Sequence, residues 1–575
     1  MRFFSFALLI ATGASSAGAQ PLTILDLVPD NAAVVVGVDS VDEARAAFDR
    51  TAIKREWWDS DGVQSWVEEQ LQQASEEFRD KAADLELNLD DLELPTGMAG
   101  AAMWLPEELN DDGSARQWEY LVAADFGEHI DATQEALDDL IVHAEESGNA
   151  WFEEEPFAGG TIWTLELPDA QEELEEWERN EQPPVDTEQL FIATHGSHLM
   201  VTSDLRQVET ALERLAGEGR GDASARSASE VTSALAAAGG TGHGYAVANF
   251  RPLIDLVGRM DDAAEDGAAG MGMKITDILK AVGLYTARSM AMNIEFDGDD
   301  GMLESGFAVM LPEKQRLLSL MDPPAAPFTP PGYVTADASS VSLFHFDFAR
   351  LFPVVNEIIS DLPEEAVQDI RPQLQMAQGF LEPMLSQLGP KIYVVSRISR
   401  PFSATSQRTL VAIECADTQA LGRSIQQLAS MFGANLDQRP FQSGVIYDLE
   451  APGFAPGSGN EFSIGLSTGA ILIGDIESVE VALRLGGNGG EGTLAADKRF
   501  RDAIPPQSGL SFGYSQMREA IEYAAWTVEN TNTATTPMEV LPPLNTLADV
   551  VGDFVSVMQS TPEGYIGRSL VLRPN

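Results

Sequence analysis

One serine in this sequence lies within a hydrolase-like pattern. Ser511 is the central residue of GLSFG, residues 509–513, which matches the G-x-S-x-G pattern around the nucleophile of α/β-hydrolases. That fold requires a histidine after the serine, whereas the last histidine of this chain is His345. The matched segment of an internal repeat also has Gly244 at the position of Ser511. We therefore expect Ser511 at the start of a strand rather than at a nucleophile turn.

Two histidines and one cysteine are the other candidates for chemistry. His195 and His198, in THGSH, could share a metal ion with nearby carboxylates, but we interpret them as residues of a hairpin turn. Cys415 is the only cysteine and therefore cannot form an intrachain disulfide. It lies in the strand-like run LVAIECAD, where a small buried hydrophobic residue is the favoured interpretation and a catalytic thiol is the alternative.

Two further patterns suggest phosphate or calcium binding. Residues 487–492, GNGGEG, match a dinucleotide-binding pattern, but they follow the expected helix SVEVALRL instead of a strand, so we interpret them as a helix exit. Asp59, Asp61 and Glu68 fit three positions of an EF-hand loop, with Gly62 at the glycine position. The first ligand position is Trp57, so we expect a turn and helix N-cap here. The sequence thus predicts no defined catalytic, cofactor or metal residues, while weak, dispersed calcium binding stays open.

The charge balance limits the partners of the protein. The chain of 575 residues has 91 acidic and 35 basic residues, a net charge of -56. Such a charge repels nucleic acid and anionic membrane surfaces and attracts cations or basic partners. Most of the basic residues are arginines, a composition also typical of salt-adapted secreted proteins. The acidic run at residues 172–188 is expected to be a solvated loop or a weak helix.

The N-terminus has the pattern of an export signal. Arg2 is followed by an apolar stretch too short to span a bilayer and then by Ala17-Gly18-Ala19, which a signal peptidase accepts. We predict that residues 1–19 are a cleaved signal peptide and that the mature protein is periplasmic or extracellular. We expect no transmembrane helix, because no later segment has about 18 consecutive apolar residues.

The elements that would position these residues occur twice. The segment FIATHGSHLMVTSDLRQVETAL, residues 191–212, aligns without gaps on FSIGLSTGAILIGDIESVEVAL, residues 462–483. Five further blocks match in the same order, and their paired reference residues are Ala33 and Val341, Leu94 and Leu388, Leu121 and Leu410, Gly244 and Ser511, and Gly283 and Gly552. We therefore predict tandem copies at residues 20–311 and 333–575. The proline-rich residues 312–332 would form an extended linker between them.

Each copy combines strands, hairpins and amphipathic helices. A strand followed by Asp204 or Asp475 leads into a helix, which predicts that these aspartates are N-caps, and Gln207 would complete a capping box with Asp204. Hairpins are expected at Asp300-Gly301 and in STPEGYIGRSLVL. Apolar stripes at residues 63–82 and 370–388 predict longer helices. The fold class is therefore α+β, with a mainly antiparallel sheet in each copy and helices packed on one face.

The start of the mature chain resembles a known family. The run LVPDNAAVVVGVDSVDEARAAF, followed by a tryptophan-rich stretch, is similar to exported bacterial proteins defined only as a domain of unknown function. The resemblance covers roughly the first 45 mature residues and implies export and repeated strand-helix units. It implies no activity.

These observations favour a non-enzymatic binding or scaffolding protein of the periplasm or cell surface. Its partner would be another envelope protein or an apolar ligand. One alternative is a carrier of an apolar ligand or lipid, for which 18 methionines would provide an adaptable lining. The other is a hydrolase that uses Ser511 or a pair of carboxylates, as in glycosidases.

Overall fold

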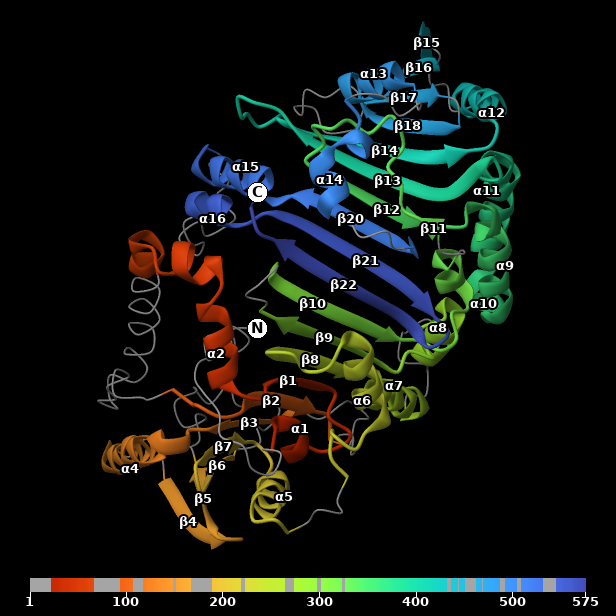
Figure 1. Ribbon diagram of the computed structural model, residues 1–575. Helices are drawn as coiled ribbons and strands as arrows, with labels where there is room; N and C mark the ends of the chain where they lie inside the picture. Colours follow the sequence, from red (N-terminus) through yellow and green to blue (C-terminus); the bar gives the residue numbers. More distant parts are fainter. Residues whose placement is uncertain are drawn as a thin grey trace. The chain divides into compact units, whose positions relative to one another are not determined.

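The chain forms two compact units in a computed structural model (Figure 1). The first unit comprises residues 1–263, 287–298 and 305–310, and the second comprises residues 264–286, 299–304 and 311–575. The structure describes residues 22–66, 94–106, 117–147, 151–166, 189–218, 223–263, 274–296, 301–322, 326–431, 436–442, 444–449, 462–467, 469–486, 492–503, 508–530 and 544–574. The predicted signal peptide, the acidic run at 172–188 and most of the predicted helix at 63–82 lie outside these residues.

Antiparallel pairing joins the strands of the first unit. In chain order they are β1 (Val34–Val38), β2 (Ala99–Trp104), β3 (Glu119–Asp125), β4 (Trp151–Phe157), β5 (Gly160–Glu166), β6 (Leu190–His195), β7 (His198–Thr202), β8 (Gly244–Asn249), β9 (Ser289–Glu295) and β10 (Gly301–Met310). Across the sheet the order is β10-β9-β8-β1-β2-β3-β7-β6-β5-β4. The long non-consecutive pairings place the first strand of the chain near the middle of the sheet.

The strands of the second unit are also joined by antiparallel pairing, and the strands of the two units are called here the first sheet and the second sheet. Those of the second unit are β12 (Ser340–His345), β13 (Leu388–Ile398), β14 (Gln407–Cys415), β15 (Leu436–Phe441), β16 (Gly444–Leu449), β17 (Phe462–Ser467), β18 (Ala470–Asp475), β20 (Ser511–Gln516), β21 (Asp553–Thr561) and β22 (Gly564–Leu572). The order across the sheet is β22-β21-β20-β12-β13-β14-β18-β17-β16-β15. When the strands named for each unit are counted along the chain, strands with the same count occupy the same place in the pairing order. The α+β class and the antiparallel sheet are confirmed.

Pairing partners show which residues of the two sheets are equivalent. Val35 pairs with Ala102 and Val247, and Val341 pairs in the same way with Val395 and Tyr514. Val35 is therefore the equivalent of Val341, two residues further along than the ungapped match that placed Ala33 there. The match of Gly244 with Ser511 is confirmed, because the pairing registers of β8 and β20 agree with it.

The ungapped match of the two hairpins is wrong by one residue along the strands. Phe191 lies opposite Thr202, and Ser463 lies opposite Gly474. Thr202 and Gly474 are equivalent, because each also pairs with the leucine of the matched LVA run in the neighbouring strand. Phe191 thus corresponds to Ser463 rather than to Phe462. A one-residue shift reverses the face of a strand residue, which explains why Phe191 is 5% exposed and Phe462 is 48% exposed.

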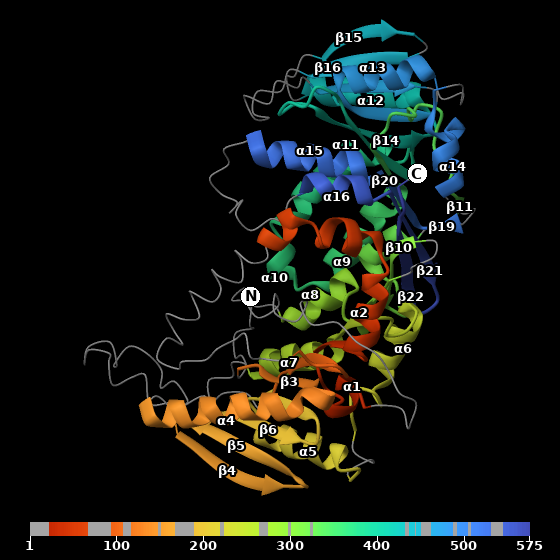
Figure 2. The same ribbon diagram turned by 60° about the vertical axis from the view of Figure 1, so that its left-hand side comes forward.

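Helices cover one face of the first sheet closely. They are α1 (Ile24–Leu27), α2 (Val41–Asp49), a π-helix (Ile53–Trp58), a 3₁₀ turn (Gly127–His129), α4 (Ile130–Ser147), α5 (Leu205–Leu215), α6 (Ser229–Ala238) and α7 (Phe250–Ala263). Figure 2 shows α1, α5 and α6 on one side of these strands and α4 and α7 on the other. The face under α1, α5 and α6, called here the helix-covered face, carries Val35, Ala102, Leu121, Val247 and Ala291, all buried.

The second unit has helices packed on both faces of its sheet. They are α8 (Ile275–Val282), a 3₁₀ helix (Arg316–Met321), a 3₁₀ turn (Phe348–Arg350), α9 (Leu351–Asp361), α10 (Glu364–Val367), α11 (Ile370–Leu385), α12 (Thr418–Met431), α13 (Ile476–Leu485), a 3₁₀ turn (Leu494–Ala496), α14 (Lys498–Ala503), α15 (Met517–Asn530) and α16 (Leu544–Val550). Val479 of α13 packs with Leu472, whereas Leu421 of α12 packs with Ile471 on the opposite face. The prediction that helices lie on one face is therefore wrong for this part of the sheet.

Both predicted N-caps are confirmed, with one difference. The Asp204 carboxylate accepts a hydrogen bond from the backbone N–H of Arg206, and Asp475 accepts one from that of Ser478. Gln207 does not take the capping-box role, since its buried side chain donates to the backbone carbonyl of Leu27. Gln207 thus contacts α1 rather than making the local hydrogen bond that the capping box would require.

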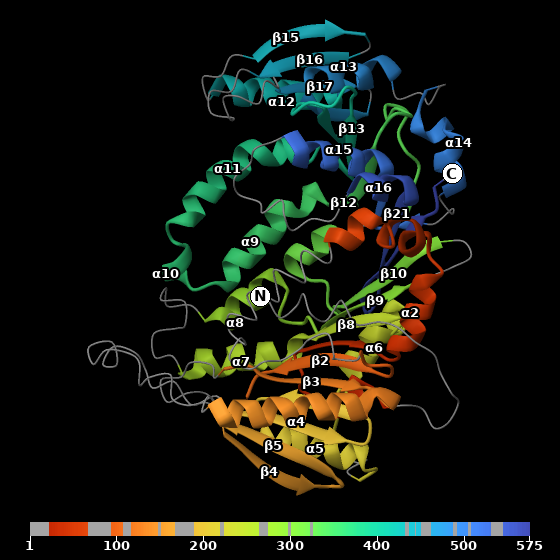
Figure 3. The ribbon, with the colours of Figure 1, turned by 90° about the vertical axis from the view of Figure 1, so that its left-hand side faces the viewer.

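The predicted long helix of the second unit forms α11, but it ends earlier than expected. Leu388, the last residue of the predicted stripe, begins β13 instead. None of the residues of α11 is buried, and Met376 is 63% exposed. Figure 3 shows α9 and α11 connected through α10, and Asn356 donates a hydrogen bond to Gln378 between the two longer helices.

Much of the proline-rich segment at 312–332 is built into the second unit. Leu320 is fully buried, and the ring of Phe328 stacks on that of Phe512 with 3.8 Å between centroids. The short strand β11 (Ala326–Pro327) pairs with β19 (Ser508–Gly509). Within the described part of the chain, no helix is long and apolar enough to cross a bilayer.

Candidate functional site

Ser511 lies at the start of a strand, as predicted from the sequence. β20 runs from Ser511 through Gln516 and pairs with β12 and β21, so Gly513 is inside a strand rather than at a sharp turn into a helix. The neighbouring His345 is buried and its Nδ1 atom contacts the backbone carbonyl of Leu510, not the Ser511 hydroxyl. The geometry of a nucleophile turn is thus not formed at this serine.

The two candidate metal-binding histidines face each other across the predicted hairpin. His195 ends β6 and His198 begins β7, and the two residues are paired. The Nε2 atom of His198 lies 4.0 Å from a carboxylate oxygen of Asp125. Burial lowers the pKa of His198, partly offset by the Asp125 carboxylate. No cluster of three or more metal-binding side chains occurs among the residues that the structure describes.

Cys415 has the environment of a core residue. It is 5% exposed and packs with Leu421 and Ile425 of α12. Burial raises the pKa of its thiol, whereas catalytic cysteines have a lowered pKa. The interpretation as a small buried hydrophobic residue is confirmed.

The EF-hand-like segment forms the predicted turn. Asp59 follows the π-helix and forms an ion pair with Lys54, and residues 61–66 are helical. Glu68, the last residue of the pattern, lies outside the described residues. The predicted helix exit before the glycine-rich run at 487–492 is formed by Gly486, which ends α13 with a positive φ of 63°. Residues 487–491 lie outside the described residues.

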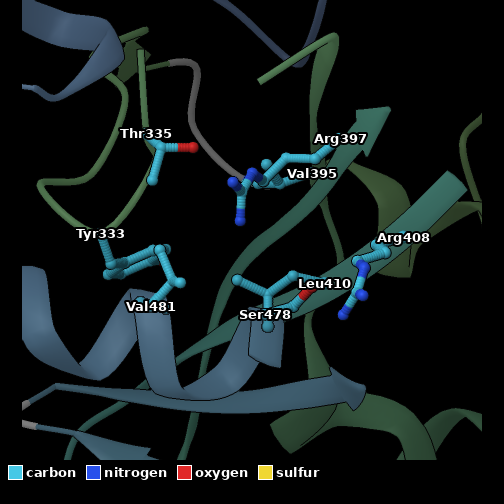
Figure 4. Close-up of a pocket in the computed structure, with 9 residues that line it drawn as sticks. Tyr333, Thr335, Val395, Arg397, Arg408, Leu410, Ser478 and Val481 are labelled. Carbon is cyan, nitrogen blue, oxygen red and sulfur yellow. The ribbon is translucent and has the colours of Figure 1, made fainter. Parts of the chain in front are cut away.

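A pocket lies between the second sheet and α13 (Figure 4). Val395 and Arg397 of β13 and Arg408 and Leu410 of β14 form its floor. The remaining walls are formed by Tyr333, Thr335, Ser478, Val481 and Ala482. Its volume is about 10 Å³, measured as the space open to the centre of a water-sized sphere, which is room for one small ion or water.

The two arginines of this pocket retain buried N–H groups that the protein does not use. Arg397 and Arg408 are directly opposite each other on paired strands, so both side chains project from the same face. Arg397 donates to Asp337 at 2.6 Å, and Arg408 contacts Asp475 at 3.0 Å and Glu477 at 2.7 Å. Among the described residues, no acceptor lies within hydrogen-bond reach of Nε and Nη1 of Arg397 or Nε of Arg408.

The first unit has a self-satisfied pair at the same place. By pairing register, Arg397 is equivalent to Trp104 and Arg408 to Glu119. The indole N–H of Trp104 donates to the Glu119 carboxylate. The unpaired donors are therefore a feature of the second unit.

The second candidate surface is the other face of the first sheet, called here the open face. It carries Val34, Val36, Ala101, Met103, Tyr120, Val122, Ala246, Ala248, Met290 and Met292, which adjoin one another across five paired strands. None of these residues is buried, and Val122, Met290 and Met292 are 44–45% exposed. The open face is therefore a continuous apolar surface that solvent reaches.

The equivalent face of the second sheet has serines at half of these positions, whereas Val394, Val411 and Phe554 keep it apolar at others. The positions of Val34 and Val36 are occupied by Ser340 and Ser342, and those of Met103, Ala248 and Met292 by Ser396, Ser515 and Ser556. Exposed apolar patches of this kind mark binding surfaces. The open face of the first sheet is therefore more apolar than the equivalent face of the second sheet.

Sequence reasoning missed both surfaces for a physical reason. AVVVGV is apolar at every position, which signals a strand with two apolar faces, but the sequence does not show which face is left partly exposed. Arg397 and Arg408 are not neighbours in the sequence. Only the pairing register of β13 and β14 places them opposite each other.

Comparisons with known proteins identify no relative: no protein family model, no curated protein and no solved structure matches this chain. The resemblance to exported proteins of unknown function therefore stays a prediction.

Proposed function

We propose that this protein is an exported, non-enzymatic binding protein of the periplasm or cell surface, and that it carries an apolar ligand on the open face of its first unit. The supporting observation is the continuous, solvent-reached apolar surface of β9, β8, β1, β2 and β3. Binding an alkyl chain there would contribute roughly 0.8 kcal/mol for each buried methylene group.

The net charge favours one class of apolar ligand. The residues of the open face carry no cationic side chain to offset the net charge of -56, so an anionic head group is disfavoured there and the ligand is an uncharged or zwitterionic lipid or a plain apolar chain. Met290 and Met292 suit such a ligand because their flexible side chains adapt to irregular shapes.

We also propose that the two units are tandem copies of one ancestral unit. The common pairing order of the described strands supports this proposal, as do the N-caps at Asp204 and Asp475. After duplication the copies would have diverged, the first keeping an apolar face and the second acquiring serines on it.

The hydrolase alternative gains no support from Ser511, which lies within a paired strand, while the His345 ring contacts the backbone carbonyl of Leu510. The Cys415 side chain is buried and the pKa of its thiol is raised, and both features disfavour a catalytic role for this cysteine.

Binding of N-phenyl-1-naphthylamine, a neutral apolar fluorophore, tests the proposal. The mature protein is expected to bind the probe, and Met292→Glu is expected to weaken binding at least about fivefold, because a carboxylate on the face must be desolvated by an apolar ligand. Met376→Glu is the matched control, since Met376 is exposed on α11 in the second unit. Thermal melting of both variants checks that the fold is retained.

Two results would contradict the proposal. One is the absence of probe binding by the unmodified protein. The other is equal weakening by Met292→Glu and Met376→Glu, which would indicate a general effect of added charge.

A further inference from the structure

The pocket between β13, β14 and α13 contains donors without acceptors. Nε and Nη1 of Arg397 and Nε of Arg408 are buried N–H groups with no partner in the described residues. A buried, unpaired N–H of a charged group costs more free energy than a neutral one. Figure 4 shows the Thr335 hydroxyl facing the guanidinium of Arg397, which adds a further polar group to the pocket wall.

The strand register makes this arrangement costly without an occupant. Like charges directly opposite each other on paired strands destabilise a sheet. Asp337 pairs with one nitrogen of Arg397, and Asp475 and Glu477 share one nitrogen of Arg408, so these carboxylates leave other N–H groups of both guanidinium groups unused. Nε and Nη1 of Arg397 and Nε of Arg408, on two residues that line the pocket, are left without an acceptor among the described residues.

The chemistry and size of the pocket define its occupant. An arginine donates and never accepts, so the occupant must accept hydrogen bonds from both side chains. The volume of about 10 Å³ admits one monatomic ion or water, not a nucleotide or sugar. We propose that this pocket binds a small inorganic anion of the size of chloride, which bridges Arg397 and Arg408 and stabilises the second unit.

The anion site is independent of the apolar ligand. It lies in the second unit, and the equivalent pair in the first unit, Trp104 and Glu119, already forms its own hydrogen bond. A salt-adapted secreted protein, for which the acidic and arginine-rich composition is typical, would meet chloride at concentrations that fill a weak site.

Thermal unfolding in sodium chloride and in sodium gluconate at equal ionic strength tests the proposal. Gluconate is too large for the pocket, so the comparison removes general screening. The unmodified protein is expected to show a Tm about 3 °C higher in chloride when chloride is roughly ten times above its Kd. The difference is expected to vanish in the double variant Arg397→Trp, Arg408→Glu, which installs the pair of the first unit.

Arg484→Gln is the matched control, because Arg484 is an exposed residue of α13 that pairs with Glu480. This variant is expected to keep the chloride effect. Equal Tm values in both salts, or a chloride effect that survives the double variant, would overturn the proposal.

Bromide provides a test that does not depend on the folding of any variant. Crystals of the unmodified mature protein soaked in sodium bromide are expected to show an anomalous difference peak between the two guanidinium groups. A water molecule at that position and no peak would overturn the proposal.

Discussion

At the scale of single residues, the side chains that sequence patterns marked as candidates for chemistry belong to strands and to a turn. Ser511 and Cys415 lie in strands, and His195 and His198 pair across a turn. Arg397 and Arg408 of the second unit, which no sequence pattern marked, keep unpartnered N–H groups instead.

His198 is expected to make the protein acid-sensitive. Burial lowers its pKa below 6.5, so the unfolded chain binds a proton more readily than the folded one. The resulting stability is present above about pH 6.5 and is lost as the pH falls. His198→Gln should therefore lose less unfolding free energy between pH 7 and pH 5 than the unmodified protein, as measured by urea denaturation. Identical pH profiles would refute this role.

Cys415 is expected to be inert while the protein is folded. A thiol-reactive disulfide reagent should label less than about a tenth of the protein at pH 8 and one thiol per chain in urea, because the side chain is buried and its pKa is raised. Cys415→Ala should cost about 1 kcal/mol of stability. Rapid labelling of the native protein would contradict the burial.

At the scale of elements, the N-caps give a direct comparison between the units. Asp475 accepts from the backbone N–H and the hydroxyl of Ser478 and also pairs with Arg408, whereas the Asp204 carboxylate accepts from the backbone N–H of Arg206 at the start of α5. We expect Asp204→Ala to cost about 1 kcal/mol and Asp475→Ala about 2 kcal/mol or more, because the latter also removes one of the two carboxylates that pair with the part-buried Arg408. Chemical denaturation monitored by circular dichroism measures both. A larger loss in Asp204→Ala would contradict this ranking.

The sequence was sufficient for the elements but not for their register. The strand-Asp-helix pattern predicted both caps, because capping depends on neighbouring residues. The match of Phe191 with Phe462 was wrong. The first unit has one residue more than the second between the strand and the helix N-cap, so an ungapped match that aligns the helices misaligns the strands by one residue. The open face and the arginine pair depend on which strands meet across the sheet, and such long-range pairing has no local signal.

At the scale of the whole molecule, the proline-rich segment is expected to resist proteolysis. The Lys314 ammonium contacts Ser560 and Thr561, and Arg316 pairs with Glu357 and Asp361. Limited trypsin digestion followed by mass spectrometry should therefore find the first cleavages elsewhere, because a protease requires a locally unfolded chain. First cleavage after Lys314 or Arg316 would show that these contacts are weak.

Native mass spectrometry of the mature protein, purified from its own cell envelope, tests the proposed carrier function most directly. We predict a bound mass in the lipid range on the unmodified chain and on Met376→Glu, and its loss in Met292→Glu. A bare chain in all three, purified without detergent, would contradict the account.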